Sequence, residues 1–197
     1  MVLLVEVILL ERHYLHDLAP GYDRDQVLAD LMTEYGEDVW NFAYFLTRKS
    51  HAADDISQEV FLVVYNRLYT FRGESTVKSW LLSITRNKSL NYLKTAFIRK
   101  VILVDVLTNR TESSPSPEAV VFDRMATKEL WDCVMRLPLK FREVILLHYH
   151  YGLPNKEIVL LLQISEGTVK SRMYRAKNKL SAMLTAQQEE GKYHEGL

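Results

Sequence analysis

Two acid-free runs of basic residues are the side chains of this 197-residue chain best suited to bind a charged ligand. Residues 78–100 contain six Lys or Arg, residues 167–180 contain five, and neither run contains Asp or Glu. Residues 1–63 hold twelve acidic and four basic residues, so the net charge of zero hides a strong asymmetry. One basic run fits an ordinary solvated helix face equally well, but two in a chain with an acidic front part favour a nucleic acid as ligand.

The second basic run lies within residues 154–180, which have the pattern of a helix-turn-helix. The first helix is expected to reach about Gln163, and Ser165 is a good N-cap for the helix that follows the turn. One face of that second helix is apolar and should pack on the core; it carries Val169, Met173, Ala176 and Leu180. The opposite face is suited to the major groove of DNA. Its candidate contacts are Ser165, Glu166, Thr168, Lys170, Ser171, Arg172, Arg175 and Lys179. An ordinary amphipathic helical hairpin is the alternative interpretation.

The elements that must position these residues are helices. Apolar residues recur at steps of three and four, and no stretch alternates with period two, which predicts an all-α fold. Residues 105–118 are polar, contain two prolines and lack this periodicity, so they indicate a flexible linker between two small helical domains, the second with the helix-turn-helix. The expected divisions are an N-terminal extension (1–24), a first domain (25–100), a linker (101–124), a second domain (125–186) and a tail (187–197).

In the first domain, helices are expected over about residues 26–49, 53–69 and 77–94. The second domain should contain four helices, with Pro138 between the first two and Gly152 at the end of the second. The expected inward positions of the first helix are Val27, Leu31, Tyr35, Val39, Phe42 and Leu46.

No pattern of residues predicts catalysis, a metal site or a cofactor. His148 and His150 are two apart on an expected helix, so they point to different faces, and no Cys or carboxylate stands at a metal-binding spacing from them. There is no Gly-rich phosphate loop and no nucleophile motif. The single cysteine, Cys133, fits a reducing compartment and is expected to be a small buried hydrophobe, with a thiol sensor as the alternative.

Residues 1–10 are almost wholly apolar, but a membrane span needs roughly 20 residues. Glu6 and the lack of a basic region before it make this segment a poor signal peptide. We therefore expect a cytoplasmic chain that does not span a membrane. Residues 1–24 are interpreted as an extension outside the functional core, either a separate helix or the product of a start codon placed too far upstream.

Three motifs together resemble the bacterial extracytoplasmic-function (ECF) sigma factors, a group of the sigma-70 family. Ile164–Leu180 is similar to the family's recognition helix, and Ala53–Phe61 (ADDISQEVF) to its polymerase-binding helix. Phe71–Asn87, with FR, SWL and ITRN in order, is similar to its promoter-melting region. The resemblance covers about residues 26–185, and the ordered pair of regions with a linker between is far more specific than a helix-turn-helix alone.

The resemblance implies a non-enzymatic protein that binds core RNA polymerase and promoter DNA and initiates transcription of a specific regulon, as in a stress response. The polymerase would contact Asp54, Asp55, Gln58, Glu59 and Phe61. The −10 element and the melted strand would meet Arg72, Lys78, Trp80, Arg86, Asn87, Lys88, Asn91 and Lys94. Trp80 would either stack on a base or pack in the core, and the recognition helix would bind the −35 element. An anti-sigma factor, frequently membrane-anchored in the family, is the further implied partner.

Some residues depart from the family pattern. Gln163 stands where the family favours Gly in the turn, so a non-Gly residue is expected in a left-handed conformation. Asn91 replaces a frequent Asp, which leaves the promoter preference open. Two other classes of protein remain: a stand-alone helix-turn-helix regulator that binds DNA as a dimer, and a helical adaptor that binds only proteins.

Overall fold

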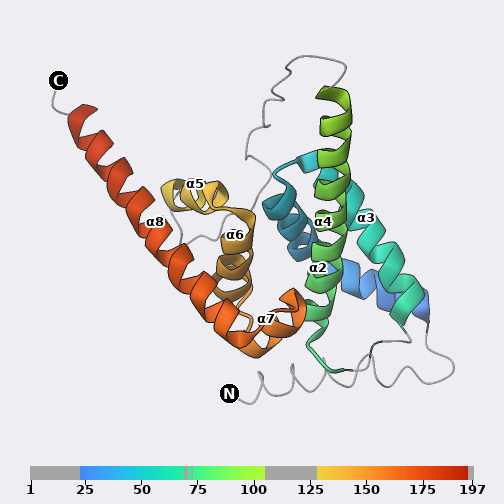
Figure 1. Ribbon diagram of the computed structural model, residues 1–197. Coiled ribbons are helices and arrows are strands. Elements are labelled where there is room, and N and C mark those ends of the chain that lie inside the picture. The colour runs from blue at the N-terminus through green and yellow to red at the C-terminus, as the bar shows by residue number, and fades with distance from the viewer. Residues whose placement is uncertain (1–22, 69–70, 72, 105–127, 195–197) are drawn as a thin grey trace. The chain divides into compact units, whose positions relative to one another are not determined.

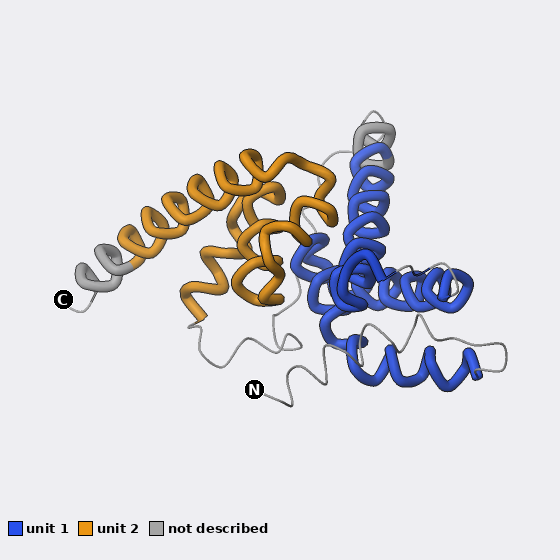
Figure 2. Tube along the Cα trace, turned by 90° about the horizontal axis from the view of Figure 1, so that it is seen from below, with its two compact units in different colours: residues 1–117 blue, residues 118–197 orange. Residues whose placement is uncertain are grey.

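The computed structural model describes residues 23–68, 71, 73–104 and 128–194, and these contain helices and no strands. The chain divides into two compact units, Met1–Pro117 and Glu118–Leu197 (Figure 2). The predicted all-α class with two helical domains is confirmed. Of the expected N-terminal extension, only Asp23 and Arg24 are among the described residues. Residues 105–124 of the expected linker lie outside them.

The first unit packs three helices against one another: α2 (Arg24–Thr47), α3 (Ser50–Arg67) and α4 (Val77–Val104) (Figure 1). The side chain of Asp23 accepts hydrogen bonds from the backbone amides of Asp25 and Gln26, which fixes the start of α2. Arg48 ends that helix in a left-handed conformation at φ 60°, so only two residues separate α2 from α3. The apolar face predicted for α2 is buried, from Val27 to Leu46.

Helix α4 begins after Thr76, whose hydroxyl accepts a hydrogen bond of 3.2 Å from the amide of Ser79. The helix was expected to end near Lys94, but it continues to Val104. Residues 77–104 contain neither Gly nor Pro, so nothing in the sequence interrupts the backbone hydrogen bonding. The first four residues of the expected linker are therefore helical.

The second unit begins with α5 (Lys128–Arg136) and α6 (Leu139–Ile145), separated at Pro138 as expected. A π-helical turn, η3 (Leu146–His150), follows α6 directly and was not predicted. In it, the amide of Tyr151 donates a hydrogen bond of 3.0 Å to the carbonyl of Leu146, five residues back. Gly152, at φ 68°, then reverses the chain, as its position predicts.

The helix-turn-helix closes the second unit, with α7 (Asn155–Leu162) followed by α8 (Glu166–His194). Helix α8 was expected to stop near Leu184, but it continues for ten further residues into the expected tail. Gly191 does not interrupt it, since one Gly in a helix interior costs only about 1 kcal/mol.

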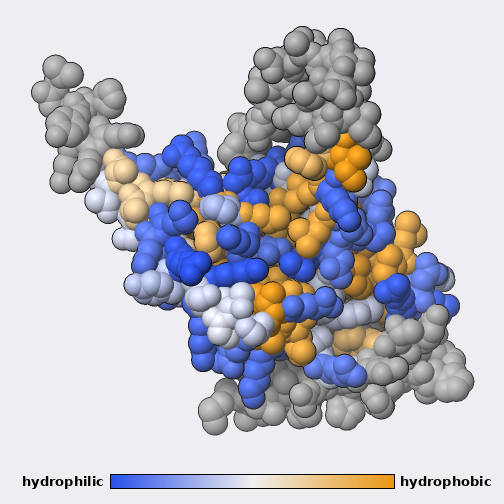
Figure 3. Space-filling view, in the orientation of Figure 1, coloured by the Kyte–Doolittle hydropathy of each residue, from blue (hydrophilic) through white to orange (hydrophobic). Residues whose placement is uncertain are grey.

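Among the described helices, none is both long and apolar enough to cross a membrane. Figure 3 shows hydrophilic side chains over much of the described surface in one view, with hydrophobic patches between them. The large apolar or aromatic side chains that remain exposed are Met32, Leu62, Phe97, Ile98, Tyr149, Leu160 and Tyr174.

Candidate functional site

The turn of the helix-turn-helix depends on one strained residue. Gln163 adopts φ 55° and ψ 45°, the left-handed conformation expected at this position, and its amide bonds to the carbonyl of Val159. The amide of Ile164 reaches the same carbonyl at 3.3 Å. These bonds satisfy the end of α7 and redirect the chain within three residues into α8.

Ser165 caps the start of α8, as predicted. Its hydroxyl oxygen accepts a hydrogen bond of 3.2 Å from the amide of Thr168 and lies 2.9 Å from the Thr168 hydroxyl. Its carbonyl accepts the first helical bond, from Val169, at 3.0 Å. The cap leaves the remaining amides of the first turn directed outwards, which favours an anion such as a DNA phosphate at this end.

The two faces predicted for α8 are present. Val169 and Ala176 are fully buried, and Met173 and Leu180 are half-buried, so this stripe attaches the helix to its unit. The eight predicted DNA contacts lie off this stripe. Thr168 and Arg172 are half-buried and the other six are exposed: Ser165, Glu166, Lys170, Ser171, Arg175 and Lys179.

These eight residues do not form one uniform surface. Lys170 Nζ lies 2.7 Å from Glu166 Oε1, and this hydrogen bond and charge hold the pKa of the Glu166 carboxyl below its ordinary value. At helical spacing, Arg172, Arg175 and Lys179 form a separate stripe with Thr168. In the described part of the chain, none of these three cations pairs with a carboxylate. We call Arg172, Arg175 and Lys179 the cationic stripe.

An aromatic residue on this helix was missed from the sequence. Tyr174 is 67% exposed, and Lys177, one turn further, places its Nζ 5.2 Å from the ring centre of Tyr149. Both lie on the side of α8 that carries Lys170 rather than on the cationic stripe. Helical spacing from Val169 already places Tyr174 away from the buried face, which is the signal that could have found it.

The acidic face of α3 is largely as predicted. Asp55, Gln58 and Glu59 are exposed on one side of the helix, and Asp54, also exposed, accepts a hydrogen bond of 2.7 Å from the indole of Trp40. Leu62, which sequence reasoning omitted, is 64% exposed and continues the same spacing. We call Asp55, Gln58, Glu59 and Leu62 the α3 face.

Phe61 does not belong to that face. Its side chain is only 7% exposed, because Phe61 lies two turns after the fully buried Ala53 and joins the core of the first unit. Burial favours a packing role for Phe61, and its direct contact with the polymerase stays a prediction. The spacing of the buried residues in α3 is the sequence signal that predicts a buried Phe61.

On α4, the expected DNA contacts divide by exposure. Asn87, Asn91 and Lys94 are exposed at a spacing of four and three residues, so they form one continuous stripe, whereas Arg86 is half-buried. Trp80 is half-buried with its ring centre 5.1 Å from that of Phe71, which fits the packing alternative. Arg72 lies outside the described residues.

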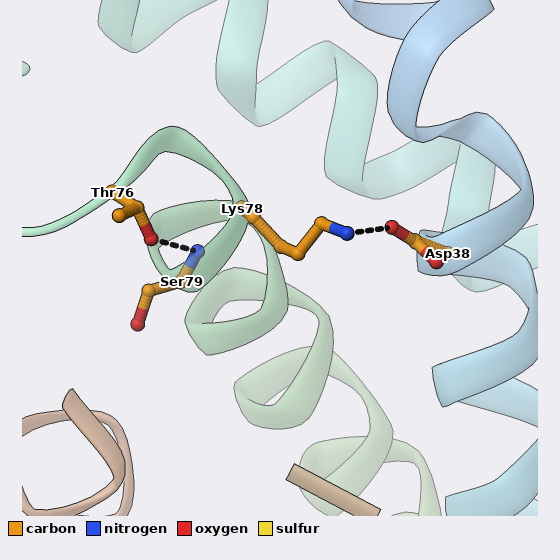
Figure 4. Close-up of polar contacts among 4 residues, drawn as sticks. All are labelled: Asp38, Thr76, Lys78 and Ser79. Carbon is orange, nitrogen blue, oxygen red and sulfur yellow. Dashed lines mark hydrogen bonds and ion pairs between the residues drawn. The ribbon is translucent and has the colours of Figure 1, made fainter. Parts of the chain in front are cut away.

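Two cations of the basic run on α4 have acidic partners on other helices. Lys78 Nζ lies 2.9 Å from Asp38 Oδ2 on α2, and Figure 4 shows this pair beside the Thr76 cap. Lys88 Nζ lies 2.8 Å from Glu59 Oε2 on α3. A run that is free of acids in the sequence is thus partly neutralised in the fold.

The cysteine and two of the histidines, His148 and His150, lie in packed surroundings. Cys133 is fully buried, as predicted, and its Sγ lies 3.3 Å from Gln187 Oε1; burial raises the pKa of the thiol. The ring of His150 packs edge-on against Trp131, and that of His148 against Tyr149. No cluster of His, Cys, Asp or Glu in the described residues could hold a metal ion.

Known families match both units in the expected order. The family described as Sigma-70 region 2 matches residues 31–96, and Sigma-70, region 4 matches residues 127–180. RNA polymerase sigma factor SigZ of Bacillus subtilis is 30% identical over 157 residues, which cover 80% of this chain and 86% of SigZ. The ECF sigma factor BldN of Streptomyces coelicolor is 27% identical over 156 residues, which cover 78% of this chain but only 59% of BldN.

A solved structure has the same fold. The sigma factor RpoE from Bartonella quintana, in complex with the anti-sigma factor NepR, matches with a TM-score of 0.64 and 22% identity, over 80% of this chain and 95% of RpoE. The region 2 match contains the α3 face, and the region 4 match contains the cationic stripe. The chain belongs to the sigma-70 family of RNA polymerase sigma factors, and it is similar to several members of the ECF group.

Proposed function

We propose that this protein directs core RNA polymerase to a specific set of promoters by recognising their −10 and −35 elements. The observation that carries the proposal is the cationic stripe of α8, because a capped helix with a row of cations beside its buried face, none paired with a described carboxylate, is suited to DNA. The same chain presents a second, polar stripe on α4 and an acidic face on α3. One protein could therefore meet duplex DNA, melted DNA and polymerase together.

For the −35 element, the first two turns of α8 would enter the major groove. Ser171, Arg172 and Arg175 are within reach of base edges in that docking, and Lys179 would meet a phosphate. Tyr174 lies outside this surface, because its exposed ring is on the side of α8 that carries Lys170.

For the −10 element, Asn87, Asn91 and Lys94 on α4 would contact the separated strand. Amide side chains offer both donors and acceptors to base edges, and Lys94 supplies a charge for the backbone. The half-buried Trp80 would support this helix by its contact with Phe71 rather than stack on a base.

The polymerase would dock on the α3 face. Asp55 and Glu59 supply negative charge that orients a basic partner, and Leu62 supplies an apolar contact among them. An anti-sigma factor is the partner we propose for regulation, since the similar RpoE structure contains one. The protein would act in the bacterial cytoplasm, where polymerase and chromosome are found.

The deciding experiment is run-off transcription with core polymerase on a library of genomic fragments, with the start sites sequenced. We expect transcripts whose upstream regions share two elements, and none without the protein. Arg172→Ala should abolish most of this transcription and leave binding to core polymerase intact. A stand-alone regulator would instead bind a palindromic site without polymerase and give no such transcripts.

A further inference from the structure

We infer that the ion pair between Glu59 and Lys88 couples polymerase binding to promoter binding. In the free chain, Glu59 and Lys88 neutralise each other's charge through this ion pair. When a basic group of the polymerase takes Glu59, Lys88 is released to bind a phosphate of the promoter, and the reverse holds. This inference rests on the proposed function.

The geometry joins two surfaces that the proposed function assigns to different partners. Glu59 lies on the α3 face beside Asp55 and Gln58. Lys88 lies on α4 one turn before Asn91, which belongs to the exposed stripe of that helix. Their charged atoms are 2.8 Å apart, and their side chains remain 57% and 32% exposed. A partner can therefore reach either member without opening the core of the unit.

Each partner competes with the ion pair: the polymerase competes with Lys88 for Glu59, and the promoter phosphate competes with Glu59 for Lys88. A carboxylate that already holds an ammonium group is a poorer site for an Arg or Lys of the polymerase. An ammonium group that already holds a carboxylate is likewise a poorer site for a phosphate. Removing either competitor frees the other residue, so binding of one partner must strengthen binding of the other by the same factor.

The size of the effect is set by the exposure of the pair. Exposed ion pairs contribute little because water and salt screen them, so the coupling should be about 2- to 5-fold at low ionic strength. Such a factor suits a step that favours DNA binding by the polymerase complex over DNA binding by the free chain.

The first test is a double-mutant cycle on the full chain with core polymerase, without DNA, at low salt. Lys88→Gln should tighten binding about 2- to 5-fold in the otherwise unchanged chain and have no effect in a chain that carries Glu59→Gln. Lys177→Gln is the matched control, since Lys177 is an exposed cation on α8 that pairs with no described carboxylate and has no role in the proposed binding surfaces, and it should change nothing. An equal effect of Lys88→Gln in both backgrounds would overturn the inference.

The second test reverses the roles, with a fluorescent single-stranded oligonucleotide of 20 nucleotides as the probe. Glu59→Gln should tighten its binding to the free chain about 2- to 5-fold, and the gain should vanish when saturating core polymerase is present. Glu37→Gln removes an exposed acid on α2 that lies outside this ion pair and outside the proposed binding surfaces, and it should give no gain. A gain that persists at saturation argues against coupling, as does no gain in the free chain.

These outcomes separate the inference from the proposed function. If the unchanged chain fails to bind core polymerase at all, the proposed function is wrong. If it binds and supports transcription while the two substitutions act additively, only the coupling is wrong.

Discussion

The indole nitrogen of Trp40 in α2 donates a hydrogen bond of 2.7 Å to Asp54 Oδ1 in α3. The Trp40 ring also stacks on Tyr44, with centres 5.5 Å apart and planes 4° from parallel. Asp54 therefore fastens the start of α3 to α2, although its side chain is exposed. Its neighbour Asp55 carries the same charge and makes no such bond among the described residues, so the two acids of this motif have different tasks.

Asp54→Ala should lower the free energy of unfolding by about 1 kcal/mol, since it removes one hydrogen bond between helices. It should also shift the fluorescence emission of Trp40, because the indole loses its acceptor. Asp55→Ala is the control and should change neither, while it weakens polymerase binding. Equal stability losses for the two substitutions would contradict this division.

Ser165→Ala should destabilise the second unit by about 1 kcal/mol, because the amide of Thr168 loses its acceptor at the helix start. Ser165→Asp should retain most of the stability, since a carboxylate caps equally well. The readout is the thermal midpoint of unfolding. Ser171→Ala, on the same helix but past its first turn, should be close to neutral, and a cost as large as that of Ser165→Ala would exclude the capping account.

Gln163→Gly should raise the free energy of unfolding by about 1 kcal/mol, because Gly adopts the left-handed conformation without the steric cost that a Cβ atom brings. Gln163→Ala keeps the Cβ atom and should give no gain. Urea unfolding of both variants measures the difference. A Gly variant no more stable than the Ala variant would show that the turn stores no such strain.

Arg175→Ala should weaken binding of the polymerase complex to its promoter by about 1–3 kcal/mol if Arg175 contacts a base. If Arg175 contacts only a phosphate, the slope of log affinity against log salt concentration should instead fall in magnitude by about one. Lys177→Ala is the matched control, because Lys177 lies two residues away and its ammonium group faces the Tyr149 ring. The ratio of promoter affinities at two salt concentrations distinguishes these outcomes. Larger losses for Lys177→Ala would move the DNA-binding surface to the other side of α8.

Cys133 should resist alkylation in the folded protein. Burial excludes the reagent and raises the pKa of the thiol, so the reactive thiolate forms at higher pH in the folded chain than in the unfolded chain. The contribution of the buried thiol to stability is therefore complete at neutral pH and decreases only as the pH rises above the ordinary thiol range. Mass spectrometry after iodoacetamide treatment, with and without urea, measures this. Rapid labelling without urea would revive the thiol-sensor alternative.

The helix-turn-helix could be predicted almost residue by residue, because its determinants are local. The Ser165 cap and the buried Val169 and Ala176 each follow from residue type and spacing over one or two helical turns. The same holds for the α2 core stripe. The left-handed Gln163 follows instead from the resemblance to a family that favours Gly at this position. The expected ends of α4 and α8 are each ten residues too early, although neither helix contains a residue that requires a stop.

What the sequence could not show depends on contacts between helices. The partners of Lys78 and Lys88 stand 40 and 29 positions away in the chain, so an acid-free run gave no sign of them. The π-helical turn at Leu146–His150 follows no 3.6-residue pattern, since the fifth carbonyl rather than the fourth accepts each bond. The burial of Phe61 differs from these features, because the spacing of the buried residues within α3 already predicts it.

The length of α8 has a practical consequence for labelling. The helix continues as one element to His194, nineteen residues beyond Arg175, which at 1.5 Å per residue is roughly 28 Å. A dye or affinity tag attached after His194 is thus held away from the DNA-binding residues by a helical spacer of the protein's own. Energy transfer from such a dye to one on the promoter would report how this helix approaches the duplex.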